Sequence, residues 1–296
     1  MILIKLQGGL GNQMFQYAFG LALSAKLNTH LYFDLSFFKQ DDHGLTPRTY
    51  QLDLFSKRVN IAGDGMINRF LNPGLMQRIC NKTGIGKTTI YREKAMSFNP
   101  DVFAVKQPAY VEGFWQSELY FAPVSASIRK ALTFRAPLNE ESAKIAAGLA
   151  QQANTVSVHV RRGDYVSSKT TNQLHGTCSV TYYQKAIALV KEQVADPVFF
   201  FFSDDSEWVQ QHLLPLTEKG VLVQHNLHND SWQDMALMSK CKHHIIANSS
   251  FSWWGAWLNP DIEKVVIAPE DWFNTKSEYF VASNIVPSNW LRLPNE

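Results

Sequence analysis

The chain has no long hydrophobic run, because no window approaches the roughly 20 apolar residues that a membrane-spanning helix needs. Its first six residues, MILIKL, are apolar over too short a stretch for a signal peptide and lead directly into a glycine-rich turn. We therefore expect a cytoplasmic protein, and the sequence is compatible with contact at the inner face of the membrane.

Cysteine is also scarce. The three cysteines, Cys80, Cys178 and Cys241, lie far apart in the sequence and form no Cys-x-x-Cys pair. This spacing argues against a disulfide framework and against a cysteine-based zinc site. A reducing compartment is the simpler interpretation.

An excess of one charge is missing as well. The 28 basic and 26 acidic residues leave a formal net charge of +2. A nucleic-acid-binding protein would concentrate basic residues on one face, so we expect no nucleic-acid partner.

The apolar content of 45% is enough for a sizeable core in a chain of 296 residues. Residues 1–6 read as a buried strand, residues 13–26 as an amphipathic helix and residues 30–34 as a second strand. Residues 39–99 carry less regular signal and suggest loops and short helices. A helix over residues 139–152, capped by Asn139, marks a boundary between a domain at 1–150 and a domain at 151–296.

The second half of the sequence is the more regular one. Short strands are expected at residues 155–160, 198–202, 221–224, 244–247 and 264–268, with helical segments between them. Strands that alternate with helices indicate a parallel, doubly wound sheet, in which ligands bind beyond the carboxyl ends of the strands. Glycine and polar clusters occupy these positions at residues 8–13, 159–165, 203–205 and 248–252.

The first cluster, Gly9-Leu10-Gly11-Asn12-Gln13, resembles a dinucleotide-binding fingerprint but places Met14 where a third glycine or alanine belongs. One interpretation is a turn whose backbone N–H groups approach a ligand at a helix N-terminus. The other is a tight turn that needs a positive φ and nothing more.

The second cluster, HVRRGDY at residues 159–165, follows a strand directly. Arg161 and Arg162 are permanently charged and can contact two phosphate oxygens each. Transfer of a sugar from a diphosphate donor needs such charge, because negative charge grows on the leaving β-phosphate. Asp164 can orient an arginine or accept a proton. A surface Arg–Asp ion pair is the structural alternative.

Of the two remaining clusters, the one at residues 203–205 follows an aromatic run, and the one at residues 248–252 begins a tryptophan-rich helix. Asp204 and Asp205 can accept hydrogen bonds from guanine or ribose, although helix capping by Ser203 or Asp204 explains the pattern equally well. We interpret Phe199 to Phe202 as a core strand. Ser249 and Ser250 are candidates for phosphate contact at a helix start, whereas Trp253 and Trp257 are expected in the core.

Metal ligands are not evident in the sequence. A metal-dependent nucleotide-sugar enzyme usually holds its ion through an Asp-x-Asp pair, and the chain contains none. His225-x-x-His228 lacks a third ligand, and the adjacent pair His243 and His244 is a weak motif. We expect no metal and no other cofactor.

Together these clusters resemble the bacterial α-1,2-fucosyltransferase family. The matching stretches are GGLGNQMFQYA at residues 8–18, HVRRGDYV at 159–166, FFSDD at 201–205, WQDMALMSKCKHHI at 232–245 and IIANSSFSWWGAWL at 245–258. The matches follow the family's order and leave only residues 56–94 largely unmatched.

This resemblance implies a GT-B-like α/β fold with two Rossmann-like halves and mainly parallel sheets. It implies inverting, metal-independent transfer of fucose from GDP-fucose to O2 of a galactose in a glycan or glycolipid, as in O-antigen synthesis. Lipid-linked acceptors would bring peripheral membrane contact. The N-terminal half would face the acceptor and the C-terminal half would bind the donor.

The same resemblance assigns roles to individual residues. Arg161 would hold the β-phosphate with support from Arg162 and Asp164, and His159 would contact guanine or ribose together with Asp204 or Asp205. Asn12 and Gln13 would line the cleft near the transferred sugar. The predicted site therefore comprises catalytic Arg161, Asp164 and Asn12, and donor-binding His159, Arg161, Arg162, Asp204, Asp205, Asn248, Ser249, Ser250, Gly11 and Gln13.

Two other functions remain open on the sequence alone. An oxidoreductase would bind its cofactor through Gly9, Gly11 and Asp34, although Met14 counts against this. A non-catalytic module that binds sugar nucleotides would also hold GDP. Only a transferase would release GDP from GDP-fucose when an acceptor is added.

Overall fold

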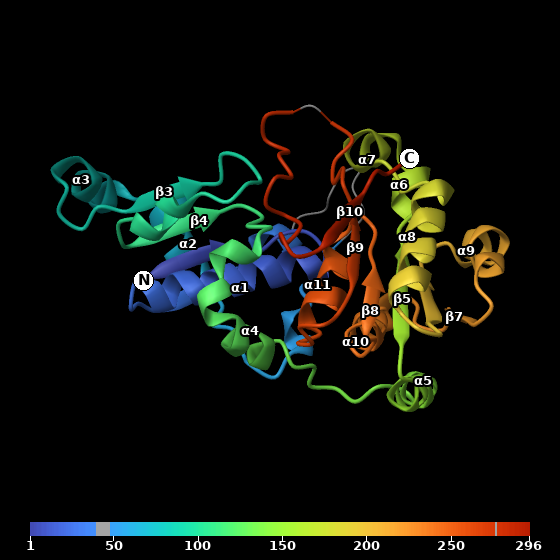
Figure 1. The fold of residues 1–296 in the computed structure, drawn as a ribbon. Helices are drawn as coiled ribbons and strands as arrows, with labels where there is room; N and C mark the ends of the chain where they lie inside the picture. Colours follow the sequence, from blue (N-terminus) through green and yellow to red (C-terminus); the bar gives the residue numbers. More distant parts are fainter. Residues whose placement is uncertain (40–47, 276) are drawn as a thin grey trace. The chain divides into compact units, whose positions relative to one another are not determined.

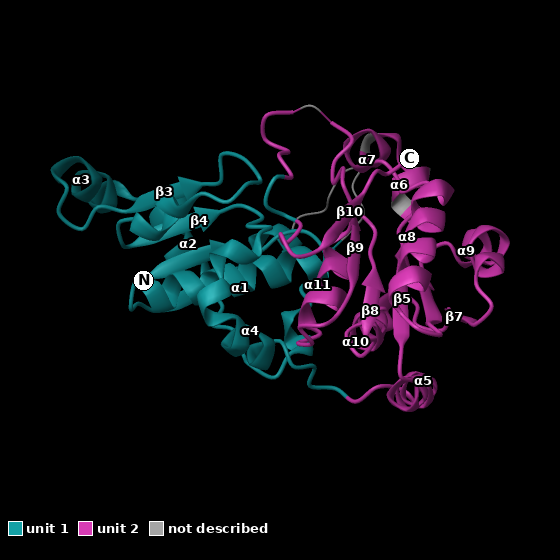
Figure 2. Cartoon of the chain, in the orientation of Figure 1, with its two compact units in different colours: residues 1–136, 283–285 teal, residues 137–282, 286–296 magenta. Residues whose placement is uncertain are grey.

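The computed structural model divides the chain into two α/β units (Figure 2) and describes residues 1–39, 48–275 and 277–296. Unit 1 comprises residues 1–136 and 283–285, and unit 2 comprises residues 137–282 and 286–296. The units divide between residues 136 and 137, ahead of the helix that we predicted at 139–152, whereas the predicted domain boundary, between residues 150 and 151, falls in the last turn of that helix. The side chains of Asp164, Ser167 and Thr170 lie outside this description.

Unit 1 is built on a parallel sheet with the strand order β2-β1-β4-β3, of which Figure 1 labels β3 and β4. Its strands are β1 (Ile2–Lys5), β2 (Leu31–Asp34), β3 (Thr89–Arg92) and β4 (Ala109–Glu112). Its α-helices are α1 (Leu10–Lys26), α2 (Asp64–Leu71), α3 (Leu75–Thr83) and α4 (Ser125–Ala131). The predicted β-α-β opening is confirmed, and α1 begins three residues before the predicted start.

The opening strand and helix form around the most apolar stretch of unit 1. Ile2, Leu3 and Ile4 are completely buried in β1. Gly8 then turns the chain with a φ of +78°, a conformation that glycine adopts at no steric cost. Helix α1 follows immediately and buries residues on most of its circumference. The glycine-rich turn is therefore fixed between two buried elements.

Unit 2 contains a parallel sheet with the strand order β10-β9-β8-β5-β6-β7. Its strands are β5 (Thr155–Val160), β6 (Val198–Ser203), β7 (Gly220–Val223), β8 (His243–Ile245), β9 (Val266–Pro269) and β10 (Leu291–Leu293). Its helices are α5 (Glu140–Gln151), α6 (Gly163–Ser167), α7 (Lys169–His175), α8 (Val180–Gln193), α9 (Ser206–His212), α10 (Trp232–Met238) and α11 (Ser250–Leu258). The five predicted strands and the doubly wound arrangement are confirmed.

The aromatic residues of unit 2 form its core. Phe199, Phe200, Phe201 and Phe202 are buried along β6, as predicted for a core strand. Trp253 and Trp257 are also buried, and their rings stack at a centroid distance of 6.0 Å, one turn apart on α11. Among the described residues, no helix combines the length and the apolar character needed to cross a bilayer.

Candidate functional site

Two arginines and two aspartates meet at the carboxyl edge of the sheet in unit 2. Arg161 and Arg162 follow β5, and Asp204 and Asp205 follow its parallel neighbour β6. Arg161 Nη1 lies 2.7 Å from Asp204 Oδ2, and Arg162 Nε lies 3.0 Å from Asp205 Oδ2. All four side chains are partly buried. The sheet therefore presents two oriented guanidinium groups at the edge where ligands of such sheets bind.

Asp204 links the two arginines, since its Oδ1 also accepts a hydrogen bond of 2.8 Å from the backbone N–H of Arg162. A carboxylate that contacts one side chain and the next backbone amide fixes both residues relative to β6. The arginines thus pair with Asp204 and Asp205, which were predicted to contact guanine or ribose, and not with a residue of their own motif. Asp164 begins α6 with Gly163, but its side chain lies outside the described residues, so its catalytic role stays a prediction.

Aromatic rings support both guanidinium groups. Arg162 Cζ lies 4.3 Å from the ring centroid of Trp208, and Arg161 Cζ lies 5.5 Å from that of Tyr165. Such cation–π contacts lower the freedom of each arginine side chain without neutralising its charge. Trp208 was not among the predicted site residues, although its position one turn into the helix after Asp205 was a usable signal.

Asp205 holds Arg162 and also caps a helix. Its Oδ1 accepts a hydrogen bond of 3.2 Å from the backbone N–H of Trp208, and the Ser203 hydroxyl accepts one of 2.9 Å from the N–H of Asp205. Helix capping was predicted for Ser203 or Asp204, but the capping residue of α9 is Asp205. Its two carboxylate oxygens therefore serve the helix and the arginine separately.

Gly163 allows the chain to pass close to Asp204. A Cβ at this position would lie 2.8 Å from Asp204 Oδ2, the atom that contacts Arg161. Any side chain would displace the carboxylate that orients this arginine. The requirement for glycine is one of space, so it applies even to alanine.

We predict that Gly163→Ala lowers turnover on the order of ten- to a hundredfold, because misplacing a positioning group by about 1 Å can have that effect. The melting temperature should change little. Gly148→Ala in α5 is the matched control, because a Cβ there meets no atom within 4 Å. Steady-state kinetics should show wild-type turnover for Gly148→Ala. Wild-type turnover for Gly163→Ala would contradict the positioning role of Asp204.

His159, the penultimate residue of β5, carries a neutral imidazole. Burial lowers its pKa to about 4, although Asp204 raises the pKa and Arg161 lowers it further. Its Nδ1 is buried and has no hydrogen-bond partner among the described residues. The ring lies 5.7 Å from that of Phe251 in the first turn of α11. This nitrogen has an unused hydrogen-bonding capacity within the described protein, which keeps the donor-binding prediction for His159 physically reasonable.

The loop after β8 leads into α11 and brings three further predicted residues to the same edge, since β8 pairs with β5. Ser249 caps α11 by accepting a hydrogen bond of 3.3 Å from the N–H of Phe251, and Ser250 is the first helical residue. Asn248 is buried, and its Nδ2 donates a hydrogen bond of 2.7 Å to the carbonyl of His175. Asn248 therefore holds neighbouring loops together, whereas the serines lie at the helix start.

The glycine-rich turn of unit 1 is held by Gln13. This completely buried side chain donates hydrogen bonds of 2.9 Å and 2.8 Å to the carbonyls of Gly8 and Thr49, and it accepts one of 2.9 Å from the N–H of Gln51. Gly11 is buried within α1. The hydrogen-bonding atoms of Gln13 thus face the protein, and its contact with a donor stays a prediction.

Asn12 is half-buried beside this turn. Its Oδ1 accepts a hydrogen bond of 2.8 Å from Gln116 Nε2, which joins the first turn of α1 to the loop after β4. The Gln116 Oε1 is buried without a partner among the described residues. Two amide side chains therefore lie together at the carboxyl edge of the unit 1 sheet, and only Asn12 of the two was predicted.

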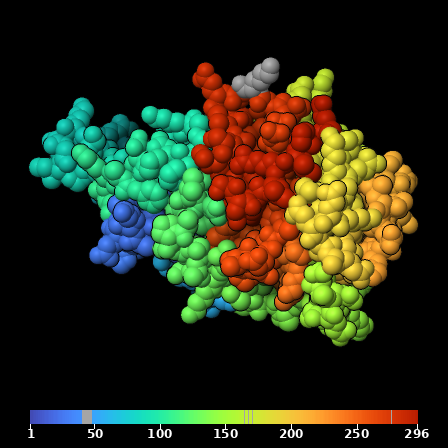
Figure 3. Space-filling model, viewed as in Figure 1, coloured from blue at the N-terminus to red at the C-terminus, as the bar shows by residue number. Residues whose placement is uncertain are grey.

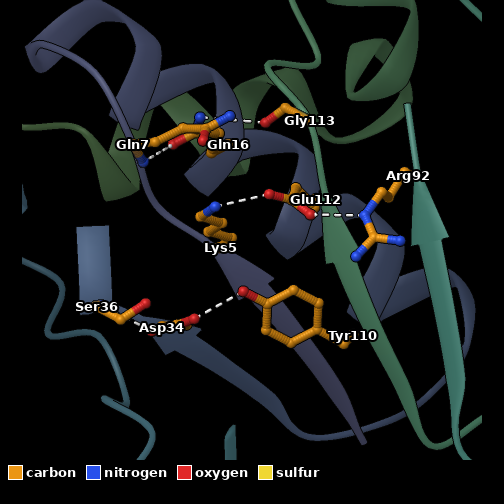
Figure 4. Close-up of polar contacts among 9 residues, drawn as sticks. All are labelled: Lys5, Gln7, Gln16, Asp34, Ser36, Arg92, Tyr110, Glu112 and Gly113. Atoms are coloured by element: carbon orange, nitrogen blue, oxygen red, sulfur yellow. Dashed lines mark hydrogen bonds and ion pairs between the residues drawn. The ribbon is translucent and has the colours of Figure 1, made fainter. Parts of the chain in front are cut away.

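Asp34 at the end of β2 does not have the environment of a ribose-binding carboxylate. It is completely buried, and its two oxygens accept hydrogen bonds of 2.7 Å each from the Tyr110 hydroxyl and from the N–H of Ser36 (Figure 4). A carboxylate that recognises ribose must reach the ligand. This arrangement disfavours the dinucleotide-dependent oxidoreductase.

The same sheet edge is tied together by Glu112 at the end of β4. One carboxylate oxygen lies 2.6 Å from Lys5 Nζ and the other lies 3.0 Å from Arg92 Nε (Figure 4). Burial alone would raise the pKa of Glu112, but the hydrogen bonds from the two cations lower it. Glu112 therefore stays ionised and connects the ends of three strands.

A small pocket of about 70 Å³ lies behind this edge in unit 1 and was not predicted. Its lining includes Tyr91, Glu93, Asn99, Trp115 and Tyr120. Trp115 has a positive φ of +57°, and Glu93 accepts hydrogen bonds from its N–H at 3.0 Å and from that of the preceding residue at 2.7 Å. The buried Trp115 Nε1 has no partner among the described residues. At this volume the pocket is well below the roughly 300 Å³ at which small-molecule sites begin, so we assign it no ligand.

Two α/β units with parallel sheets, one of which carries an arginine–aspartate cluster at its carboxyl edge, define a glycosyltransferase of the GT-B type. The sequence pattern of Glycosyl transferase family 11 matches residues 1–293, so the chain belongs to this family.

Among proteins with similar sequences is an alpha-1,2-colitosyltransferase of Escherichia coli, 36% identical over 99% of this chain and 98% of the relative. The O-antigen biosynthesis glycosyltransferase WbnK of Escherichia coli is 31% identical over 97% of this chain and 99% of the relative. The fucosyltransferase NodZ from Bradyrhizobium shares the fold, with a TM-score of 0.52 and 14% identity over 89% of this chain and 95% of that chain. FUT1 of Arabidopsis thaliana gives a TM-score of 0.53 and 12% identity over 97% of this chain and 74% of that chain. The GT-B-like fold is therefore confirmed.

Proposed function

We propose that this glycosyltransferase transfers fucose from GDP-fucose to O2 of a galactose, with inversion at the anomeric carbon and without a divalent metal. The observation that carries the proposal is the pair of oriented guanidinium groups, Arg161 and Arg162, at the carboxyl edge of the unit 2 sheet. The names of the bacterial relatives, α-1,2-specific in one case and acting in O-antigen biosynthesis in the other, support the linkage and the process.

In this mechanism the acceptor hydroxyl attacks the anomeric carbon while GDP departs from the opposite face. The transition state has oxocarbenium character, and negative charge grows on the β-phosphate. Arg161 takes up this charge with Arg162 beside it, and the N-terminus of α11 with Ser249 and Ser250 supplies further donors. Asp164 accepts the proton of the acceptor or orients Arg161.

The donor's nucleoside is assigned to His159 and to the loop after β6. A neutral imidazole can form a hydrogen bond with guanine or ribose without competing with the arginines for phosphate. Asp204 and Asp205 both use their two carboxylate oxygens within the protein, so an aspartate that contacts ribose gives up one of these bonds when the donor binds. We place the acceptor on unit 1, where Asn12 meets Gln116.

A second donor is supported by the colitosyltransferase relative. Colitose is fucose without its 3-hydroxyl group, so the two donors would offer the same diphosphate to Arg161 and Arg162. The two donors differ in one hydroxyl group, which the protein either contacts or does not contact. The class of reaction is the same in both cases.

We predict that GDP-fucose exceeds GDP-colitose in kcat/KM by on the order of a hundredfold or more, because a site built for a hydroxyl rejects an analogue that lacks it. The measurement is GDP release with a panel of galactosides, followed by determination of the linkage. A preference for GDP-colitose would overturn the proposal that fucose is the transferred sugar, but it would still support transferase activity. Binding of GDP without release from either donor would indicate a non-catalytic sugar-nucleotide-binding module.

A further inference from the structure

The stretch of chain between Asp64 and Glu93 contains no acidic residue. Residues 65–91, which we call the α3 segment, include Arg69, Arg78, Lys82 and Lys87. The whole protein is nearly balanced in charge, so this stretch concentrates positive charge in one place. The segment spans most of α2, all of α3 and nearly all of β3, and it is also the part of the sequence that the family resemblance left largely unmatched.

The α3 segment also exposes large apolar side chains. Leu75, Met76 and Ile85 are 78%, 75% and 79% exposed, and Ile79 is also exposed. No residue of α3 is buried. Figure 1 shows α3 at the margin of unit 1, and Figure 3 shows this part of the chain standing out from the rest of that unit. Apolar groups of this size normally pack against a core, so their exposure in a group points to a partner.

Helix α3 is held by its polar side chains instead. Gln77 Nε2 donates a hydrogen bond of 2.9 Å to the carbonyl of Gly86, and Asn81 Oδ1 accepts one of 2.9 Å from the N–H of Thr88. Gln77 also donates to Asn81 at 3.0 Å. The amides therefore fasten the helix to its own segment and leave the apolar side chains outward.

The helical spacing sets basic residues beside this apolar face. Leu75 and Ile79 lie four residues apart and share one side of α3. Arg78 and Lys82 follow at the adjoining positions, so their charges border the apolar stripe. Helices that lie in a membrane interface typically combine two features. Their apolar side chains enter the headgroup region, and their basic side chains contact anionic headgroups.

We propose that the α3 segment docks on the surface of an anionic phospholipid bilayer. Charge complementarity selects this partner, because all four charged residues of the segment are basic. Each basic residue near an anionic surface adds to the affinity, and Leu75, Met76 and Ile79 anchor the helix at the headgroup boundary. The inference does not depend on which sugar the enzyme transfers.

The test is sedimentation of the full chain with vesicles of phosphatidylcholine alone or of phosphatidylcholine with phosphatidylglycerol. We expect binding to the anionic vesicles at about 0.1 M salt and its loss at about 1 M salt. Leu75→Gln/Met76→Gln/Ile79→Gln should weaken binding more than tenfold. Arg78→Gln/Lys82→Gln should weaken it on the order of tenfold to thirtyfold.

Ile262→Gln is the matched control, since Ile262 is 89% exposed but stands alone between Asp261 and Glu263. This variant should bind vesicles like the wild type. All variants should keep the wild-type melting temperature and the wild-type rate on a water-soluble galactoside, which separates docking from catalysis. Equal binding to both vesicle types, or wild-type binding by the Leu75→Gln/Met76→Gln/Ile79→Gln variant, overturns the proposal. The proposal is also overturned if the wild type does not bind vesicles but forms a dimer in solution, and the Leu75→Gln/Met76→Gln/Ile79→Gln variant disrupts that dimer.

Discussion

Arg161→Ala is expected to lower turnover by at least roughly a thousandfold, because removing one donor that stabilises developing charge already costs about a hundred- to a thousandfold. Arg161 brings a full positive charge in addition to its hydrogen bonds. Asp204 and the ring of Tyr165 orient this guanidinium, so no neighbouring side chain can take its position without rearrangement. Arg161→Lys should recover only part of the rate, since an ammonium group cannot contact two phosphate oxygens in the same plane.

Single-turnover kinetics with saturating GDP-fucose and a galactoside measure this effect. The defect should appear in the chemical step, whereas GDP affinity should fall much less. Arg58→Ala is the control, because Arg58 is an exposed arginine of unit 1 outside the candidate site. If Arg161→Ala kept most of the wild-type activity at an unchanged melting temperature, Arg161 would have no place in the mechanism.

The second large effect concerns Asp234, a partly buried residue of α10. Burial raises its pKa to about 7, although a hydrogen bond from Asn226 lowers it. The folded protein therefore holds a proton on Asp234 that the unfolded chain releases near its ordinary pKa of 3.8. Stability should fall as the pH rises between these two values. The shift corresponds to about 4 kcal/mol of unfolding free energy in total.

Urea unfolding measured from pH 4 to pH 8 tests this expectation. Asp234→Asn should remove the loss of stability toward pH 7, and Asp230→Asn, at an exposed position in the same loop region, should retain it. Burial of His159 and His244 lowers their pKa values and has the opposite sign, because stability falls as acid protonates them in the unfolded chain. The Asp234→Asn variant should therefore gain stability from pH 4 to about 6.5. An unchanged slope above pH 5 would contradict the assignment to Asp234.

Much of the fold could be predicted because hydrophobic periodicity is strongest where strands are buried. Residues 155–160 and 198–202 were predicted as strands because they are rich in valine and phenylalanine. The structure buries nearly all of their side chains. Strands β3 and β10 were missed for the opposite reason. β3 alternates half-buried with exposed residues, and β10 has three residues of which two are exposed. Such strands owe their conformation to pairing with a neighbour, which the sequence does not display.

The candidate site was predictable where one motif contains both charged residues and a glycine that allows a turn. Arg161 and Arg162 stand in such a motif, and the parallel pairing of β5 with β6 brings them to Asp204 and Asp205. Trp115 could not be predicted in the same way. Its place in the unit 1 pocket depends on a positive φ and on hydrogen bonds from the loop to Glu93, which lies more than 20 residues away in the sequence.

The pairing of two arginines with two aspartates has a consequence for how a donor arrives. Arg161, Arg162, Asp204 and Asp205 together carry no net charge, so this quartet exerts little pull on a distant anion. Under the proposed function, the donor diphosphate replaces the carboxylates as the partner of the two arginines at close range. Recognition at this edge is thus an exchange of partners, which favours ligands whose shape lets them replace both aspartates at once.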